Sequence, residues 1–72
     1  MIIDKDNAFE IKMTVHSVSA ELNESLLNMQ NKLSDPEFHK YKHAVGKVMG
    51  ELYFKILEPV YEIHPELDTS KK

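Results

Sequence analysis

The chain has 72 residues and a mass of 8.4 kDa, and it contains no cysteine and no tryptophan. This length allows at most one small domain, spanning residues 1–72. Without cysteine, neither a disulfide framework nor a thiolate zinc site is available to stabilise so short a chain. The formal net charge is −3, from 9 basic and 12 acidic residues, and all nine basic residues are lysines. Arginine best grips phosphate and is absent, so broad nucleic-acid affinity is not expected.

The N-terminal residues carry acidic side chains before any apolar run develops, so we expect neither a secretory signal nor a transit peptide. No stretch approaches the roughly 18 consecutive apolar residues that span a bilayer. We therefore predict a cytoplasmic protein without a membrane partner. The composition, 42% hydrophobic and 29% charged, is typical of a folded domain. Residues 1–5 and 66–72 are short and polar, and we expect them to be disordered.

The first half of the chain predicts one long helix over residues 7–33. Asn7 stands three residues before Glu10 as a helix start signal, and no glycine or proline follows until the turn. An alternative exists for residues 9–15, where apolar and polar side chains also alternate with the period of a strand. A strand there would need a partner strand from a second chain, because an isolated strand has no ladder.

The second half predicts another helix, over residues 36–58. The sequence Ser-Asp-Pro-Glu at residues 34–37 combines a capping side chain, a proline suited to the first turn and a glutamate that favours the positive helix end. Pro59 follows, yet the apolar period continues, so we expect either a kink or a break with a short turn over residues 59–64. Two helices of similar length joined by a short turn predict an antiparallel hairpin.

Each predicted helix carries more apolar surface than one neighbouring helix covers. On the first helix, one stripe forms a core seam of Ala8, Ile11, Val15, Val18, Leu22, Leu26, Met29 and Leu33. A second stripe on a different side holds Phe9, Met13, Ala20 and Leu27, with His16 beside it. On the second helix, half of the circumference is apolar and consists of Phe38, Tyr41, Val45, Val48, Met49, Leu52, Tyr53, Ile56, Leu57, Val60 and Ile63.

This excess of apolar surface predicts a second copy of the chain. A folded chain of this mass exposes on the order of 4,600 Å², and chains near 60 residues bury only about 60% of the surface of the unfolded chain. We therefore predict an all-α fold, a two-helix antiparallel hairpin that homodimerises into a four-helix bundle with twofold symmetry. The residues predicted to pack within and between hairpins are Val15, Val18, Leu22, Leu26, Val45, Gly46, Val48, Met49, Gly50, Leu52, Tyr53 and Ile56.

Two glycines lie inside the second predicted helix, where each costs about 0.8 to 1 kcal/mol relative to alanine. Gly46 and Gly50 stand four residues apart beside the apolar arc, so they favour the close approach of another helix or of an aromatic ring. The alternative is that Gly50 marks a kink or a tolerated weakness. The pattern of small residues four apart is typical of membrane helices and has low specificity in a soluble chain.

No constellation in the sequence predicts an enzyme. His39 and His43 have the spacing at which two imidazoles share a metal, but no third ligand is evident and lysines adjoin both. His16 stands beside Ser17, yet no orienting acid or oxyanion loop accompanies them, so we expect a structural or surface histidine. We predict no catalytic residue, no metal and no cofactor.

Charge is unevenly distributed along the second predicted helix, because residues 38–50 hold three lysines and no acid. This basic patch, a possible partner-binding site, consists of His39, Lys40, Lys42, His43 and Lys47. Lysines that only keep the surface hydrated are the plainer interpretation. The function that we predict is a small non-enzymatic protein–protein interaction module, such as a regulator, adaptor or antitoxin-like inhibitor, working as a helical homodimer. The alternative is an RNA-binding hairpin dimer that uses the basic patch.

Overall fold

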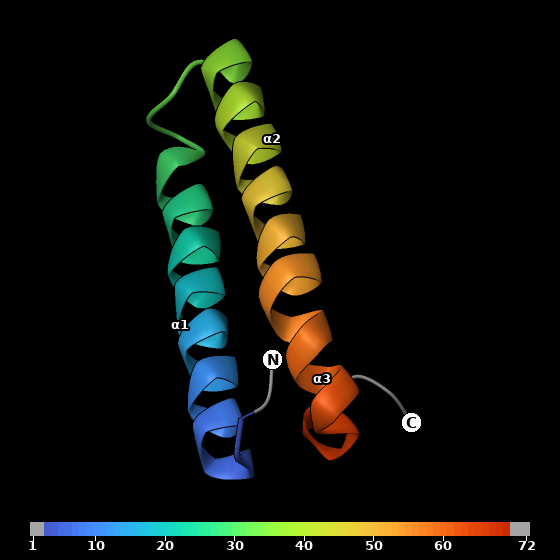
Figure 1. Cartoon of the computed structure of the whole chain (residues 1–72). Coiled ribbons are helices and arrows are strands. Elements are labelled where there is room, and N and C mark those ends of the chain that lie inside the picture. Colours follow the sequence, from blue (N-terminus) through green and yellow to red (C-terminus); the bar gives the residue numbers. More distant parts are fainter. Residues whose placement is uncertain (1–2, 70–72) are drawn as a thin grey trace.

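The computed structural model describes residues 3–69, and they form an antiparallel pair of helices (Figure 1). The elements in chain order are α1 (Lys5–Met29), α2 (Asp35–Leu52), the π-helical turn η1 (Tyr53–Leu57), α3 (Glu58–Ile63) and the 3₁₀ turn η2 (Pro65–Leu67). The predicted all-α hairpin is confirmed, and within the described part of the chain residues 9–15 are helical, so the strand alternative is wrong. Across residues 3–69, no helix is long and apolar enough to cross a membrane.

Helix α1 begins two residues before the predicted start, because Asp4 and not Asn7 is its N-cap. The Asp4 carboxylate accepts the Asn7 backbone N–H at 2.7 Å and the Asn7 side-chain amide at 3.1 Å. The helix ends at Met29, four residues short of the predicted Leu33. Residues 30–32 form the turn instead, with the N–H groups of Lys32 and Leu33 both donating to the Met29 carbonyl. Polar residues in this run compete with the backbone for hydrogen bonds and so favour a turn.

Helix α2 starts where the sequence predicts, on a complete capping box. The Ser34 hydroxyl accepts the Glu37 backbone N–H at 3.3 Å, and the Glu37 carboxylate accepts the Ser34 backbone N–H at 3.0 Å. Two backbone donors that the helix leaves without partners are thereby satisfied. The hydrogen bonds from Ser34, first from its backbone and then from its side chain, lower the pKa of Glu37 below its ordinary value.

Pro59 does not break the second rod, because the turn before it is widened. The Glu58 N–H donates to the Tyr53 carbonyl five residues back, and the helical course continues through α3 to Ile63 (Figure 1). A proline lacks an N–H, and in a regular α-helix its ring clashes with the carbonyl four residues earlier, here that of Lys55. The π-helical turn provides the extra room, so of the two expected outcomes, a kink or a break, the break does not occur.

The small core lies at the open end of the hairpin, where the C-terminal turn closes over α1. Ala8, Val60 and Leu67 form the buried cluster. Partly buried Ile3 and Tyr61 pack against it. Burial, and after it the negative charge of Asp68, raises the pKa of Tyr61.

Three polar contacts fasten the C-terminal segment to the start of the chain. Lys12 is buried, and its ammonium group donates to the Leu67 carbonyl at 2.7 Å. The His64 ring Nε2 lies 2.9 Å from the Ile3 carbonyl oxygen, and the exposed pair Lys5–Glu66 is 4.0 Å apart. In the structure, residues 3–5 and 66–68, which were expected to be disordered, therefore take part in this closure. Residues 1–2 and 70–72, also expected to be disordered, lie outside the described residues.

Toward the loop, the side chains between the two helices are less completely buried. Val15, Val45 and Leu57 are buried along the seam, and the Ser25 and Tyr41 hydroxyls share a hydrogen bond of 2.6 Å. Other predicted seam and packing residues are only half-buried, namely Leu22, Leu26, Met29, Leu33, Met49, Leu52 and Ile56. The hairpin is therefore packed more tightly at its open end, where Ala8, Val60 and Leu67 form the core, than near the loop.

Replacing Lys12 by methionine tests the closure at the core. Lys12→Met keeps the apolar stem but leaves the Leu67 carbonyl without its donor, so we expect a loss of about 1 to 3 kcal/mol in the free energy of unfolding. Urea denaturation measures this loss. Lys5→Met is the matched control, because exposed Lys5 makes only a long ion pair and should change stability by less than about 0.5 kcal/mol. Equal effects of the two substitutions would contradict the buried role of Lys12.

Replacing Ser34 by alanine tests the capping box. We expect Ser34→Ala to lower stability by about 1 kcal/mol at pH 7, measured by thermal melting followed by circular dichroism. Because the pKa of Glu37 is lower in the folded chain, its contribution is complete above the ordinary value of 4.5 and is lost as the pH falls through the folded value. The stability of the wild-type chain relative to Glu37→Gln should therefore shrink in acid, because glutamine has no charge to lose, and a difference that stays the same at every pH would contradict this contribution of Glu37.

Candidate functional site

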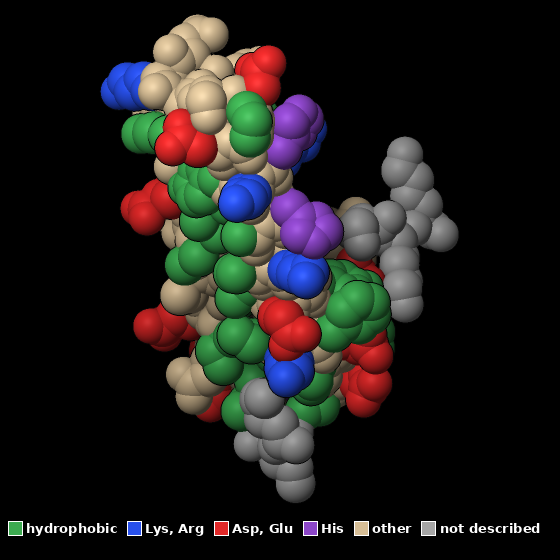
Figure 2. Space-filling model, turned by 90° about the horizontal axis from the view of Figure 1, so that it is seen from above, with side chains coloured by type: hydrophobic (Ala, Val, Ile, Leu, Met, Phe, Trp, Pro, Cys, Tyr) green, Lys and Arg blue, Asp and Glu red, His purple; other side chains and the backbone are tan. Residues whose placement is uncertain are grey.

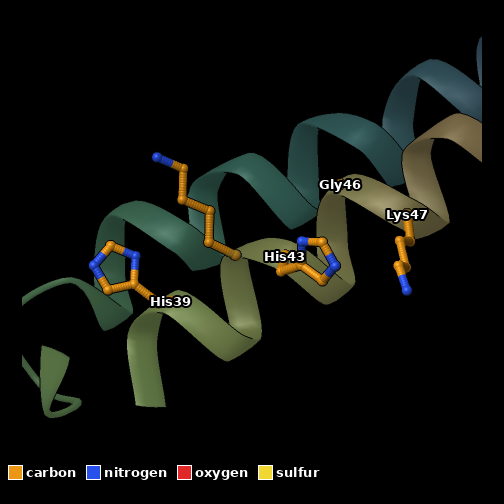
Figure 3. Close-up of a pocket in the computed structure, with 5 residues that line it drawn as sticks. His39, His43, Gly46 and Lys47 are labelled. Carbon is orange, nitrogen blue, oxygen red and sulfur yellow. The ribbon is translucent and has the colours of Figure 1, made fainter. Parts of the chain in front are cut away.

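The candidate site is a shallow basic groove on the outer side of α2. It is a hollow of about 510 Å³ lined by His39, Lys42, His43, Gly46 and Lys47. His39 and His43 project from the same side of α2 one turn apart, and Lys47 extends away from both rings (Figure 3). The basic groove is named below by these five residues.

Gly46 makes the floor of the basic groove. No atom outside its own helix backbone and chain neighbours lies within 4 Å of the position where a Cβ would stand. Because a helical residue faces those three and four positions before it, the missing side chain leaves space beside Lys42 and His43. The glycine lowers the stability of the helix at this position, and it leaves an open notch between cationic or protonatable side chains.

The structure brings together four of the five residues of the predicted basic patch. His39, Lys42, His43 and Lys47 line the groove, whereas Lys40 is exposed but does not line it. Lys40 follows His39 directly, and adjacent residues on a helix point about 100° apart. Gly46, predicted as a packing residue, joins the groove instead. The sequence signal that could have placed it there is its spacing of three from His43.

Electrostatically, the basic groove favours an anionic group. Among the described residues, neither Lys42 nor Lys47 takes part in an ion pair. Both ammonium groups are exposed, so their charge is screened by water and salt and attracts carboxylate or phosphate at modest strength. The imidazoles of His39 and His43 add hydrogen-bond donors and acceptors beside them.

Neither a metal site nor a Ser–His pair is assembled within the described residues. Across residues 3–69, no group of three histidine, cysteine or acidic side chains could hold a metal. His16 and Ser17 are both exposed on α1, and no hydrogen bond joins them in this part of the chain. His39 and His43 therefore enter the site as groove-lining side chains.

A second surface is an apolar stripe that runs along the junction of α1 and α2. Figure 2 shows it along one face, with histidine and most of the lysine side chains to its right and acidic side chains on both sides. Val48, Leu52 and Ile56 line a hollow of about 440 Å³ here, rimmed by Lys47, Glu51 and Lys55. Val48 is 49% exposed, and Val18 of α1 is also exposed. These predicted packing residues are thus left uncovered by the chain itself.

The second apolar stripe predicted on the first helix is also uncovered. Phe9, Met13, Ala20 and Leu27 are all exposed, and Leu27 reaches 72%. The prediction that one neighbouring helix cannot cover both stripes is confirmed. Phe54 on the second rod is 66% exposed as well, packed edge-on against Tyr53.

Glycine packing inside the hairpin is not observed. Gly46 and Gly50 both face open space, so α1 does not approach either of them. Their predicted role in close packing stays a prediction about a second molecule.

The closure at the open end was missed by the sequence analysis. No pattern in the sequence pairs Lys12 with Leu67, which lies in a tail expected to be disordered. One apolar residue in a polar segment gives no periodic signal.

No family model, no curated protein and no solved structure matches this chain. The two surfaces are therefore interpreted from the residues that form them.

Filling the notch gives a test of its role. Gly46→Ala places a methyl group in open space, so we expect the isolated chain to gain up to about 1 kcal/mol in stability from helix propensity. Ala44→Gly, at an exposed position of the same helix, is the matched control and should lose a similar amount. Chemical denaturation measures both. A destabilising Gly46→Ala would show that the notch is packed in solution.

Proposed function

We propose that this chain is a small, non-enzymatic protein–protein interaction module that works as a helical homodimer. The observation that supports this most is the amount of apolar surface that the hairpin leaves in water. Leu27, Phe54 and Val48 are among the large apolar side chains that stay exposed, and the total exposed surface of 5595 Å² exceeds the roughly 4,600 Å² expected for a compact monomer of this mass. Large exposed apolar patches on a soluble protein are typical of interaction sites.

Dimerisation accounts for only part of this surface. A twofold dimer covers one face of each hairpin, whereas exposed apolar side chains lie on several sides, among them Val48, Leu27 and Phe54. A surface that remains after self-association is available to a different protein. The basic groove would form its polar rim, as charged residues do around an apolar interface.

The chemistry of the basic groove favours an acidic protein partner. Lys42 and Lys47 supply positive charge without internal pairing, and the groove floor at Gly46 accepts a side chain or a close backbone. An acidic segment with one apolar anchor fits such a surface, since opposite charge steers association and the anchor supplies the stability. A regulator, adaptor or antitoxin-like inhibitor would use a surface of this kind.

RNA binding is the second candidate, supported by the same unpaired lysines. Twofold symmetry would place two copies of the basic groove on one particle, and each could contact phosphates. The absence of arginine and the net charge of −3 count against it.

The proposal is tested by capture from native lysate with two baits. The wild-type chain should retain one stoichiometric protein, and the groove variant Lys42→Glu should retain far less of it, because an attractive charge becomes repulsive. Lys5→Glu is the control outside the groove. Retention of no stoichiometric protein by the wild type would contradict a protein-binding role.

Salt dependence separates the RNA alternative from the proposal. If lysines neutralise phosphates, binding to structured RNA should weaken steeply between low and physiological salt. A gel shift with the purified chain measures this. We expect no shift even at low salt, and a strongly salt-dependent shift abolished by the groove variant would favour RNA over protein.

A further inference from the structure

The apolar stripe along the junction of α1 and α2 is the surface best suited to a second copy of the chain. Val18 and Val48 are exposed there, beside the hollow formed with Leu52 and Ile56. The stripe follows the length of the face (Figure 2). Two such stripes placed face to face would make the inner layers of a four-helix bundle.

The two helices that border the stripe have opposite charges over the half of the hairpin near the loop. Between Lys12 and Lys32, the only charged residues of the first helix are Glu21 and Glu24. Between Glu37 and Glu51, the only formally charged residues of the second helix are Lys40, Lys42 and Lys47.

The register of the hairpin places these charges at matching levels. Ser25 and Tyr41 lie side by side through their hydroxyl hydrogen bond of 2.6 Å. The two helices are antiparallel, so a residue before Ser25 on α1 lies level with the residue equally far after Tyr41 on α2. Val18, seven residues before Ser25, therefore lies level with Val48, seven residues after Tyr41. By the same count, Lys47 lies within two residues of the level of Glu21, and Lys40 within two residues of the level of Glu24.

We propose that a second copy docks on this face with the twofold axis parallel to the helices, so that each α2 packs over the α1 of its partner. This inference rests on the proposed function, in which the chain is a homodimer. The two loops then lie at the same end of the bundle. Val18 and Val48 of both copies meet in one layer across the axis.

Charge distinguishes this arrangement from its alternative. With the axis along the helices, Lys47 faces Glu21 of the partner subunit. With the axis across the helices near the level of Ser17, α1 would lie on α1 and α2 on α2, and Glu21 would lie level with Met13 of the partner subunit, which offers no charge. The first arrangement therefore pairs Glu21 with an opposite charge and the second does not, although each exposed pair contributes little by itself.

The hairpin has enough surface for such a dimer. A stable interface of standard size buries about 800 Å² on each partner, which is a small part of the 5595 Å² of total surface that the chain exposes. Gly46, which faces the basic groove, stays outside the contact.

Cysteine cross-linking tests the arrangement, because the chain has no cysteine of its own. Asn31→Cys labels the loop, and Ser17→Cys labels the middle of α1; both positions are exposed. With a short bis-maleimide, we expect Asn31→Cys to form covalent dimers and Ser17→Cys to stay uncoupled, since the axis passes near the loops and places the two Ser17 positions on opposite sides of the bundle. The reverse result would overturn the arrangement, because the alternative axis brings the Ser17 positions together and separates the loops.

The oligomeric mass of the same samples separates the two proposals. If sedimentation finds a dimer and Asn31→Cys does not cross-link, the docking mode is wrong and the homodimer stands. If sedimentation finds a monomer and neither cysteine cross-links, the homodimer itself fails.

Charge reversal gives an independent readout of the same arrangement. Lys47→Glu and Glu21→Lys should each weaken dimerisation on the order of tenfold, because each appears twice across the axis. The double variant should restore the wild-type dissociation constant. Glu62→Lys, an exposed charge in α3 away from this stretch, is the control. Additive loss in the double variant would overturn the predicted pairing.

Discussion

The central constraint on this chain is that a two-helix hairpin gives each helix only one neighbour. Both helices carry apolar side chains on more than one side, so the hairpin covers only part of them. Leu27 and Phe54 remain largely in water, and within residues 3–69 the buried apolar residues are only Ala8, Val15, Val45, Leu57, Val60 and Leu67. The proposed dimer, the basic groove and the docking arrangement all follow from this imbalance.

The fold partly relieves the imbalance at one end. The turn after α3 supplies Leu67 as a third apolar wall, and buried Lys12 satisfies its carbonyl. The π-helical turn allows the second rod to reach that point without a break at Pro59. Near the loop no comparable wall exists, and there α1 and α2 hold opposite charges on either side of an exposed apolar stripe. The half of the hairpin near the loop, which the chain does not close by itself, is therefore the half best suited to bind a partner.

The sequence predicted the hairpin, the start of α2 and the uncovered second stripe, because capping signals and helical periodicity are local properties. It did not predict the closure, because the contact of Lys12 with Leu67 joins residues 55 positions apart. Pro59 was ambiguous from sequence, since whether a widened turn forms depends on the packing of Val60 on Ala8. The basic groove was predicted from charge and spacing, but Lys40 was included and Gly46 was assigned to packing.

Sedimentation equilibrium at micromolar concentration tests the central claim most directly. The account predicts a species of twice the chain mass, about 16.8 kDa from two chains of 8.4 kDa, with a melting temperature that rises with protein concentration. A single compact species of 8.4 kDa that melts cooperatively at the same temperature at every concentration would contradict it. In that case one hairpin would tolerate its exposed apolar surface without a second copy.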